Sequence, residues 1–476
     1  MKMEALRVVR LDNLTLDEAC TLQLCTALDG SPVRILSLAH CTIGDSTKAS
    51  SLLANCLGTL QSLVKLDLTG NILGSRCCEK LADAFQSEGM QIRELYLGGN
   101  KFGPDGGSLV ATSLGQLHYL ERLDVSDNEL DEDVCRELAE SLREVISFGI
   151  VTRECTMKHF EGGNNNFGDD ACSELITAFS NEVTKHIGLK NCELGPVAGA
   201  AIGRGLIKPT IAWEEIDVSD NKLGKEGANS IWWSMRKNHS LFNLNMSNNQ
   251  IGAEFGTEAD ELGMHGISID TALERNFTLR FLNMNGNKIS AKAGVTFAEC
   301  LVSNKSLQTI EFNDNDLDSI VGEYMGERLE DDMQIVSLSF NGNNLGWKGG
   351  QCIANALFTN RFLMSLDLGY NKMGENGAKV GLIFARALYE NNILKTLKLA
   401  GNRFGCQAGE AFAEALKRNK SLTELDFFNN RLSEEVGAKF LEMLETNFAL
   451  TELNLCEVEI GSEHATSISE IISNRQ

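Results

Sequence analysis

Residues 394–433 read LKTLKLAGNRFGCQAGEAFAEALKRNKSLTELDFFNNRLS. Within this stretch Leu394, Leu397 and Leu399 precede Asn402 at fixed offsets. The same arrangement returns 28 residues later, when Leu422, Leu425 and Phe427 precede Asn430. Apolar residues at the first, fourth and sixth positions, followed by an asparagine at the ninth, therefore define a repeated unit, and the rest of the chain consists of copies of it.

Each copy combines two periodicities. The apolar residues at the fourth and sixth positions alternate with others, which is the pattern of a strand with one buried face. In residues 407–419 the apolar residues Ala408, Ala411, Phe412, Ala415 and Leu416 follow the spacing of one helix face. Each copy is therefore predicted to form a strand, a turn and a helix.

The copies cover the whole sequence. The ninth, or ladder, position is occupied in order by Cys41, Asn71, Asn100, Asn128, Asn165, Cys192, Asn221, Asn249, Asn287, Asn315, Asn343, Asn371, Asn402 and Asn430. We expect 15 repeats, or 16 with an irregular first copy in which Leu14 takes the ladder position. Residues 1–35 are predicted to be an N-terminal capping repeat, 36–446 the regular solenoid and 447–476 a C-terminal capping repeat.

Two repeats are longer than the others. The spacing is 37 residues between Asn128 and Asn165, and 38 between Asn249 and Asn287. The extra residues are expected within 143–158 and 253–267, where an insertion would leave the solenoid as a surface loop. Such loops could form a binding face or could simply be tolerated length.

This repeat predicts an α/β solenoid that bends into a horseshoe. Parallel strands lie about 4.8 Å apart, whereas packed helices need about 8–10 Å. The parallel sheet is thus expected on the concave face and the helices on the convex face. The ladder asparagines are interpreted as partners for backbone groups where the chain turns out of the strand, and not as a reactive site.

The 28- and 29-residue copies and their Asn-x-(Leu/Ile/Phe)-Gly turns, such as residues 100–103, 221–224 and 249–252, resemble the ribonuclease-inhibitor-like class of leucine-rich repeats. This resemblance implies a protein-binding function. The class includes ribonuclease inhibitors, Ran GTPase-activating proteins, sensor domains of immune receptors, actin regulators and ciliary subunits. The sequence has no strongly acidic C-terminal tail of the Ran-activator type, and no nucleotide-binding domain is expected before the repeats.

The concave face should carry the partner-binding residues. Eleven acids against two bases, Lys190 and Lys398, lie between and just after the two strand leucines of the 15 repeats. Such a lining favours a partner with a basic surface. The acids expected to contact it are Asp124, Asp217, Asp314, Asp367 and Asp426, and the aromatic anchors are Tyr96, Phe281, Tyr370 and Phe428, with repeats 12 to 14 as the first place of contact. The alternative is that these acids only solvate an exposed sheet.

One tryptophan stands apart from this pattern. Trp233 falls where other copies carry Asp83, Glu299 or Glu414 on the predicted helix. It is therefore expected either to point to solvent as part of a second contact surface or to pack under the adjacent helix.

Composition restricts the other possibilities. A net charge of −23 disfavours nucleic acid and anionic membranes as partners. We find neither a signal-peptide pattern nor an apolar run long enough to span a membrane, so we expect a cytoplasmic protein with its 14 cysteines reduced and mostly buried. The seven histidines show no metal spacing, and no catalytic constellation, cofactor motif or metal motif is recognised.

These observations predict a non-catalytic scaffold that binds protein within a larger cytosolic or cytoskeletal assembly, of which a ciliary one is a specific case. Two alternatives remain. One is a GTPase-activating protein of the Ran-activator type, and the other is an inhibitor that occludes a basic enzyme.

Overall fold

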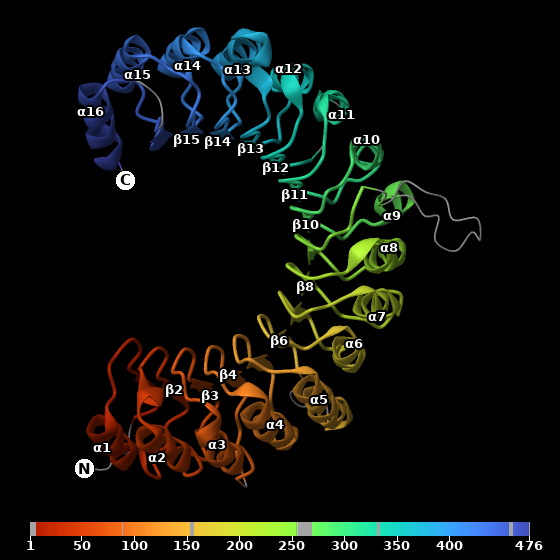
Figure 1. Cartoon of the computed structure of the whole chain (residues 1–476), viewed down its shortest axis with the longest axis vertical. Coiled ribbons are helices and arrows are strands. Elements are labelled where there is room, and N and C mark those ends of the chain that lie inside the picture. Colours follow the sequence, from red (N-terminus) through yellow and green to blue (C-terminus); the bar gives the residue numbers. More distant parts are fainter. Residues whose placement is uncertain are drawn as a thin grey trace. The chain divides into compact units, whose positions relative to one another are not determined.

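The structure is a computed structural model that describes residues 6–87, 89–152, 157–253, 255, 269–330, 334–456 and 460–475. The chain divides into two compact units, Met1–Ser234 (unit 1) and Met235–Gln476 (unit 2). In each unit strands alternate with helices along the chain, and in Figure 1 the strands line one side of each unit while the helices line the other. The predicted α/β solenoid is therefore confirmed within each unit.

The sheet of unit 1 is parallel, with consecutive strands as neighbours and paired residue for residue. Its strands are β1 (Val8–Arg10), β2 (Ile35–Ser37), β3 (Lys65–Asp67), β4 (Glu94–Tyr96), β5 (Arg122–Asp124), β6 (His159–Glu161), β7 (His186–Gly188) and β8 (Glu215–Asp217). Its helices are α1 (Glu18–Leu28), α2 (Thr47–Leu57), α3 (Cys78–Phe85), α4 (Gly103–Ser113), α5 (Glu132–Thr152), α6 (Asp169–Ala178), α7 (Pro196–Leu206) and α8 (Gly224–Met235), with short 3-10 helices η1 (Ile43–Asp45), η2 (Ser75–Cys77) and η3 (Leu114–Gln116).

Unit 2 repeats this arrangement with the same register between neighbours. Its strands are β9 (Asn243–Asn245), β10 (Phe281–Asn283), β11 (Thr309–Glu311), β12 (Ser337–Ser339), β13 (Ser365–Asp367), β14 (Thr396–Lys398), β15 (Glu424–Asp426) and β16 (Glu452–Asn454). Its helices are α9 (Ile269–Arg275), α10 (Ala291–Cys300), α11 (Ser319–Glu330), α12 (Gly346–Ala356), α13 (Lys379–Glu390), α14 (Cys406–Arg418), α15 (Glu434–Thr446) and α16 (Ser462–Ser473), with the 3-10 helix η4 (Met373–Asn376).

The core of each repeat lies between its strand and its helix. The middle residue of a strand is buried, as Leu123 is in β5 and Leu397 in β14. The first and third residues flank it and are mostly half-exposed on the other side of the sheet. We call the surface that these residues form, with the turn residues that follow, the strand face of each unit. It is the side predicted to be concave, and it is where the partner-binding residues were expected.

The ladder asparagines hold the turns that leave the strands. Asn128 is fully buried, and its Nδ2 donates hydrogen bonds to the carbonyl oxygens of Leu97 (2.9 Å), Val125 (3.1 Å) and Ser126 (2.9 Å). Its Oδ1 accepts a hydrogen bond from the backbone N–H of Asn100 at 3.1 Å. Each amide thus joins its own turn to the preceding repeat, which confirms the structural interpretation of this position.

Cysteine replaces this amide only in part. The Cys192 thiol donates to the carbonyl oxygen of Gly162 at 3.2 Å, and the Cys41 thiol donates to that of Leu11 at 2.8 Å. The thiol offers one donor where the amide offers two donors and an acceptor.

A second row of buried asparagines lies where the helices of unit 2 lead back to the strands. Asn419 Nδ2 donates to the carbonyl oxygens of Leu388 (2.7 Å) and Asn391 (2.8 Å), and its Oδ1 accepts from the N–H groups of Ser421 and Leu422. The sequence motif Asn-x-Ser at this corner therefore serves the repeat geometry.

The predictions for the two longer repeats are tested to different extents by the structure. Residues 143–152 continue α5, which is 21 residues long, so the expected surface loop is wrong for this part of the insertion. The added turns are amphipathic, with Val145 and Ile146 buried, and Phe148 stacks on His118 with ring centroids 4.4 Å apart. Most of the second expected insertion, 253–267, lies outside the described residues. The assignment of 1–35 and 447–476 as capping repeats stays a prediction.

Candidate functional site

The expected partner-binding residues fall into both units. Tyr96, Asp124 and Asp217 are third strand residues of unit 1, and Phe281, Asp367 and Asp426 lie in strands of unit 2. The turn residues Asp314, Tyr370 and Phe428 also belong to unit 2. The structure brings Asp367, Tyr370, Asp426 and Phe428 into the neighbourhood of one another, in and just after the strands β13 and β15 that flank β14.

The strand-end aspartates have a local structural role. Oδ1 of Asp124, Asp217 and Asp367 accepts the backbone N–H two residues later at 2.9 Å, and Asp426 does so at 3.0 Å. The asparagines in the same place, Asn245, Asn283 and Asn454, accept the corresponding bond. An oxygen at this position therefore closes the turn, and the negative charge is an addition that the fold does not require.

The electrostatic environment of these aspartates differs from that of a solvated acid. Burial raises the pKa of Asp124 and of Asp367 above the ordinary value, although hydrogen bonds from the following residues act in the opposite direction. Asn341 Nδ2 also donates to Asp367 Oδ1 at 3.1 Å. Both carboxylates are thus partly withdrawn from water, which strengthens their interaction with an approaching cation.

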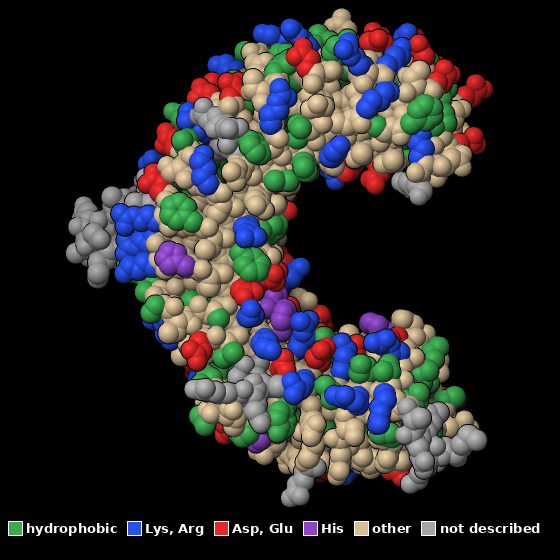
Figure 2. All heavy atoms as spheres, turned by 180° about the vertical axis from the view of Figure 1, so that it is seen from behind, with side chains coloured by type: hydrophobic (Ala, Val, Ile, Leu, Met, Phe, Trp, Pro, Cys, Tyr) green, Lys and Arg blue, Asp and Glu red, His purple; other side chains and the backbone are tan. Residues whose placement is uncertain are grey.

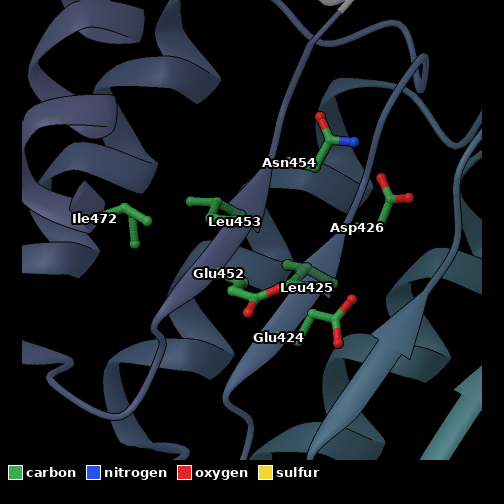
Figure 3. Close-up of a pocket in the computed structure, with 7 residues that line it drawn as sticks. All are labelled: Glu424, Leu425, Asp426, Glu452, Leu453, Asn454 and Ile472. Atoms are coloured by element: carbon green, nitrogen blue, oxygen red, sulfur yellow. The ribbon is translucent and has the colours of Figure 1, made fainter. Parts of the chain in front are cut away.

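A pocket of about 340 Å³ lies at the last two strands of unit 2. Figure 3 shows Glu424 and Asp426 from β15 beside Glu452 and Asn454 from β16, with Ile472 contributed by α16. Lys398 Nζ lies 2.9 Å from Glu424 Oε1 and is the cation that pairs with this group among the described residues. Three carboxylates against one ammonium leave the pocket negative, and it is suited to a lysine or arginine side chain of a partner.

Tyr370 is the exposed aromatic of this region. Its side chain is 46% exposed, and its backbone has φ +54°. The ring lies over Gly401, where a Cβ atom would collide with it. Phe428 and Phe281 are only half-exposed. In unit 1, Tyr96 is tied to its neighbours, because Lys65 Nζ lies 4.5 Å from its ring centroid and its hydroxyl donates to Glu94 at 3.1 Å.

The strand face of unit 1 also carries bases that the sequence interpretation missed. Lys65, Arg122, His159 and His186 are first residues of their strands, on the same side as the predicted acids. The residues just before β4, β6 and β7 add Arg93, Lys158 and Lys185. Arg93 and Lys158 form ion pairs with Glu121 (2.8 and 2.7 Å), and Lys185 forms one with Glu214 (2.5 Å). These bases lie among the acids Glu94 and Glu215, which are also first strand residues, so the first-residue row of unit 1 is mixed and the acidic lining stays a prediction. Strand alternation was the available signal, since residues on both sides of the middle leucine share one face.

Two histidines form a connected polar cluster on this surface. His186 Nε2 lies 2.5 Å from Glu161 Oε1, and its Nδ1 lies 2.9 Å from Glu215 Oε2. The His159 ring stacks on the His186 ring with centroids 4.5 Å apart. Gly188 leaves the space that Glu161 occupies, because a Cβ atom there would collide with that carboxylate.

The two histidines respond to this setting in opposite ways. Burial alone would lower the pKa of His186, but the hydrogen bonds and charges of Glu161 and Glu215 outweigh burial and raise it. Burial, with the positive charges of His186 and Arg122, lowers the pKa of His159. The two carboxylates thus favour the protonated form of His186, whereas burial beside it favours the neutral form of His159.

Trp233 is half-buried on α8 and does not project fully into solvent. The choice between a second contact surface and packing under the adjacent helix stays a prediction for this residue. Within the described part of the chain, no three His, Cys, Asp or Glu side chains are arranged to hold a metal ion. The described helices also include none with the length and apolar character that crossing a bilayer requires.

Comparison with known proteins identifies the repeat. A family model described as "Leucine Rich repeat" matches residues 275–298 and 359–380. The ribonuclease inhibitor of Sus scrofa is 26% identical over 324 residues, which cover 62% of this chain and 68% of that protein. The chain is therefore a leucine-rich repeat protein, and its sequence is similar to that of ribonuclease inhibitor.

Other leucine-rich repeat relatives are larger. NACHT, LRR and PYD domains-containing protein 3 of Mus musculus is 24% identical over 232 residues, which cover 48% of this chain and 22% of that protein. The present chain therefore spans about a fifth of the length of that relative. Among solved structures, the TLR13–ssRNA13 complex aligns over 90% of this chain and 50% of the TLR13 chain, with 18% identity and a TM-score of 0.44.

Proposed function

We propose that the chain is a non-catalytic scaffold that holds a protein partner with a basic surface against its strand face. The observation that carries this proposal is the negative pocket of Glu424, Asp426 and Glu452 in the same unit as the exposed ring of Tyr370. Charge accelerates encounter with a basic partner, and an exposed aromatic supplies affinity once the partner is bound. We further propose that this partner belongs to a larger cytosolic or cytoskeletal assembly, of which a ciliary one is a specific case.

Two double variants test this proposal on the full chain. Asp367→Asn with Asp426→Asn removes two charges while keeping the turn-closing oxygen that Asn245, Asn283 and Asn454 provide elsewhere. The matched control, Glu410→Gln with Glu414→Gln, removes two exposed charges from α14 on the helix side. Each protein is immobilised, exposed at low salt to an extract of the source cells, and the captured proteins are quantified by mass spectrometry.

We expect the strand-face variant to lose a subset of basic proteins by about tenfold, whereas the control retains them. Capture of the same proteins in the same amounts by both variants would contradict the proposal. Crosslinks that map the retained partner to the helices would contradict it as well.

We also propose a second candidate function, inhibition of a basic enzyme by occlusion. It is supported by the similarity to ribonuclease inhibitor over 62% of the chain. Titration of the chain into pancreatic-type ribonuclease with a fluorogenic RNA substrate tests it. A linear fall in activity that reaches zero at a one-to-one ratio would support this function, and unchanged activity at a hundredfold excess of the chain would remove it for that enzyme.

A further inference from the structure

The outer side of unit 2 carries three aromatic rings that are each covered by a cation. Lys379 Nζ lies 5.8 Å and Lys348 Nζ 5.9 Å from the ring centroid of Trp347. Arg386 lies 5.7 Å from the ring of Phe358. Arg418 lies 4.6 Å from the ring of Tyr389 and also donates a hydrogen bond to its hydroxyl. We call Trp347, Phe358, Lys379, Arg386, Tyr389 and Arg418 the outer cation patch.

Helix α13 is the centre of this patch. Lys379, Leu382, Arg386 and Tyr389 are exposed, and their spacing of three, four and three residues places them on one stripe of the helix. Leu382 and Tyr389 are 42% and 45% exposed. The stripe therefore offers apolar contact area between two positive charges. Over ten residue steps it is about 15 Å long.

Helices α11 and α15 of unit 2 have a different outer surface, which is mainly acidic. α11 exposes Glu327 and Glu330, while α15 exposes Glu434, Glu435 and Glu442. These carboxylates agree with a chain of net charge −23. In Figure 2, Lys and Arg side chains can be seen along the outer rim of this unit, with Asp and Glu side chains on both sides. The basic surface is thus narrow and is flanked by acids.

The cations of the patch are not neutralised by the chain itself. Lys379 and Arg386 of the patch, and Lys348 beside it, form no ion pair within the described part of the chain, although acids outnumber bases overall. An aromatic ring holds each of these cations in place at little cost in hydration. The patch therefore presents preorganised positive charge beside exposed leucine and tyrosine side chains, a composition typical of protein interfaces.

The shape and the charge of the patch decide which partner fits. A long polyanion such as RNA would extend beyond the stripe and meet the carboxylates of α11 and α15. A single helix of two to three turns matches the length of the stripe, and its own side chains can pack over Leu382. We propose that the outer cation patch binds an amphipathic helix of a protein partner that carries Asp or Glu beside an apolar stripe. This binding is independent of the strand face.

A designed peptide probes this surface directly. The probe is an 18-residue fluorescein-labelled helix with one leucine stripe bordered by glutamates, and its counterpart has lysines in place of the glutamates. Fluorescence anisotropy is measured with the full chain, with Arg386→Glu plus Arg418→Glu, and with Leu382→Ala. Lys439→Glu on α15 is the matched control, because Lys439 is exposed on a neighbouring helix outside the patch. Circular dichroism verifies that every variant is folded.

We expect the acidic peptide to bind and the basic one not to bind. The double charge reversal should weaken binding at least about tenfold, Leu382→Ala about threefold to tenfold, and the control by less than about twofold. The strand-face variant Glu424→Lys with Glu452→Lys should leave binding unchanged. Absence of binding at 100 µM chain, or equal affinity for the charge-reversed variant, would overturn the proposal. Tighter, patch-dependent binding of an 18-nucleotide poly-uridylate would also overturn it, since the patch would then be a polyanion site.

Discussion

A single imidazole in unit 1 is expected to make stability depend on pH. His186 bridges Glu161 and Glu215, and its pKa is raised in the folded protein. Its contribution is therefore fully present below the unfolded pKa of about 6.5, and it is lost as the pH rises through the higher folded value.

The prediction is tested with His186→Gln. At pH 6 the variant should be less stable than the parent by about 1–3 kcal/mol in urea unfolding, and the difference should shrink by pH 8.5. His159 acts with the opposite sign, because its lowered pKa gives a contribution that is lost as the pH falls. His239→Gln, at an exposed histidine, is the control and should show a small difference at both pH values. A difference for His186→Gln that grows toward pH 8.5 would contradict this account.

A single ladder asparagine is expected to contribute several kcal/mol to the free energy of unfolding, because its amide makes several buried hydrogen bonds. Asn128→Ala removes four hydrogen bonds and leaves three carbonyl oxygens and one N–H buried without that partner. The cost should be about 2–4 kcal/mol of unfolding free energy. Asn128→Cys should cost less, because Cys41 and Cys192 show that a thiol can supply one of these bonds. The exposed Asn392→Ala is the comparison, and an equal cost for it would show that the ladder bonds are not decisive.

At the scale of the elements, two glycines set how closely α11 and α12 approach. A Cβ atom on Gly322 would lie 2.6 Å from Cα of Gly349, and one on Gly349 would lie 2.9 Å from Cα of Gly322. Both distances are too short, so the helices must separate when either residue is enlarged. Gly322→Ala should destabilise unit 2 by about 1–3 kcal/mol, although alanine favours a helix over glycine by about 1 kcal/mol.

Thermal unfolding of Gly322→Ala and of Asn355→Ala separates the two effects. Asn355 is exposed on α12, so its replacement tests helix propensity alone and should be neutral or slightly stabilising. An unchanged or higher midpoint for Gly322→Ala would show that α11 and α12 can separate without loss.

The strand–helix order could be predicted from the sequence because the same pattern of apolar residues and asparagine occurs in each repeat. The core leucines and the ladder asparagines follow from period and position alone. The extension of α5 through Thr152 could not, since an insertion breaks the repeat that served as the reference. Its own residues carried a signal, because Val145 and Ile146 continue the apolar face of Leu138 and Leu142.

The candidate site was less predictable than the fold. Charge at the third strand residue could be read from the sequence, but the hydrogen bond that the Ser126 N–H donates to Asp124 could not, because it depends on the turn geometry. The cluster around His186 required the space left by Gly188, which is a property of three neighbouring strands together. The outer cation patch could not be predicted either. Lys379, Leu382 and Arg386 stand out only when the exposed side of their helix is compared with the exposed sides of the neighbouring helices.

At the scale of the whole molecule, the net charge opposes the compact state. The chain carries −23 at pH 7, and its isoelectric point is about 4.8. Self-repulsion of this size destabilises the folded chain and is screened by salt. The ion pairs of the strand face, such as Lys65 with Glu94 and Arg93 with Glu121, are half-exposed and contribute at most about 1 kcal/mol each. Screening these pairs therefore removes less stability than screening the repulsion restores.

The apparent unfolding midpoint at pH 7.5 should consequently rise by a few degrees between 20 and 500 mM NaCl. Differential scanning fluorimetry with the full chain is sufficient for the measurement. The same series at pH 5, near the isoelectric point, is the internal control, because the net repulsion is nearly absent there and the rise should disappear. A midpoint that falls with salt at pH 7.5 would mean that local pairs such as Lys158 with Glu121 outweigh the repulsion, and that the charges are arranged more favourably than their sum implies.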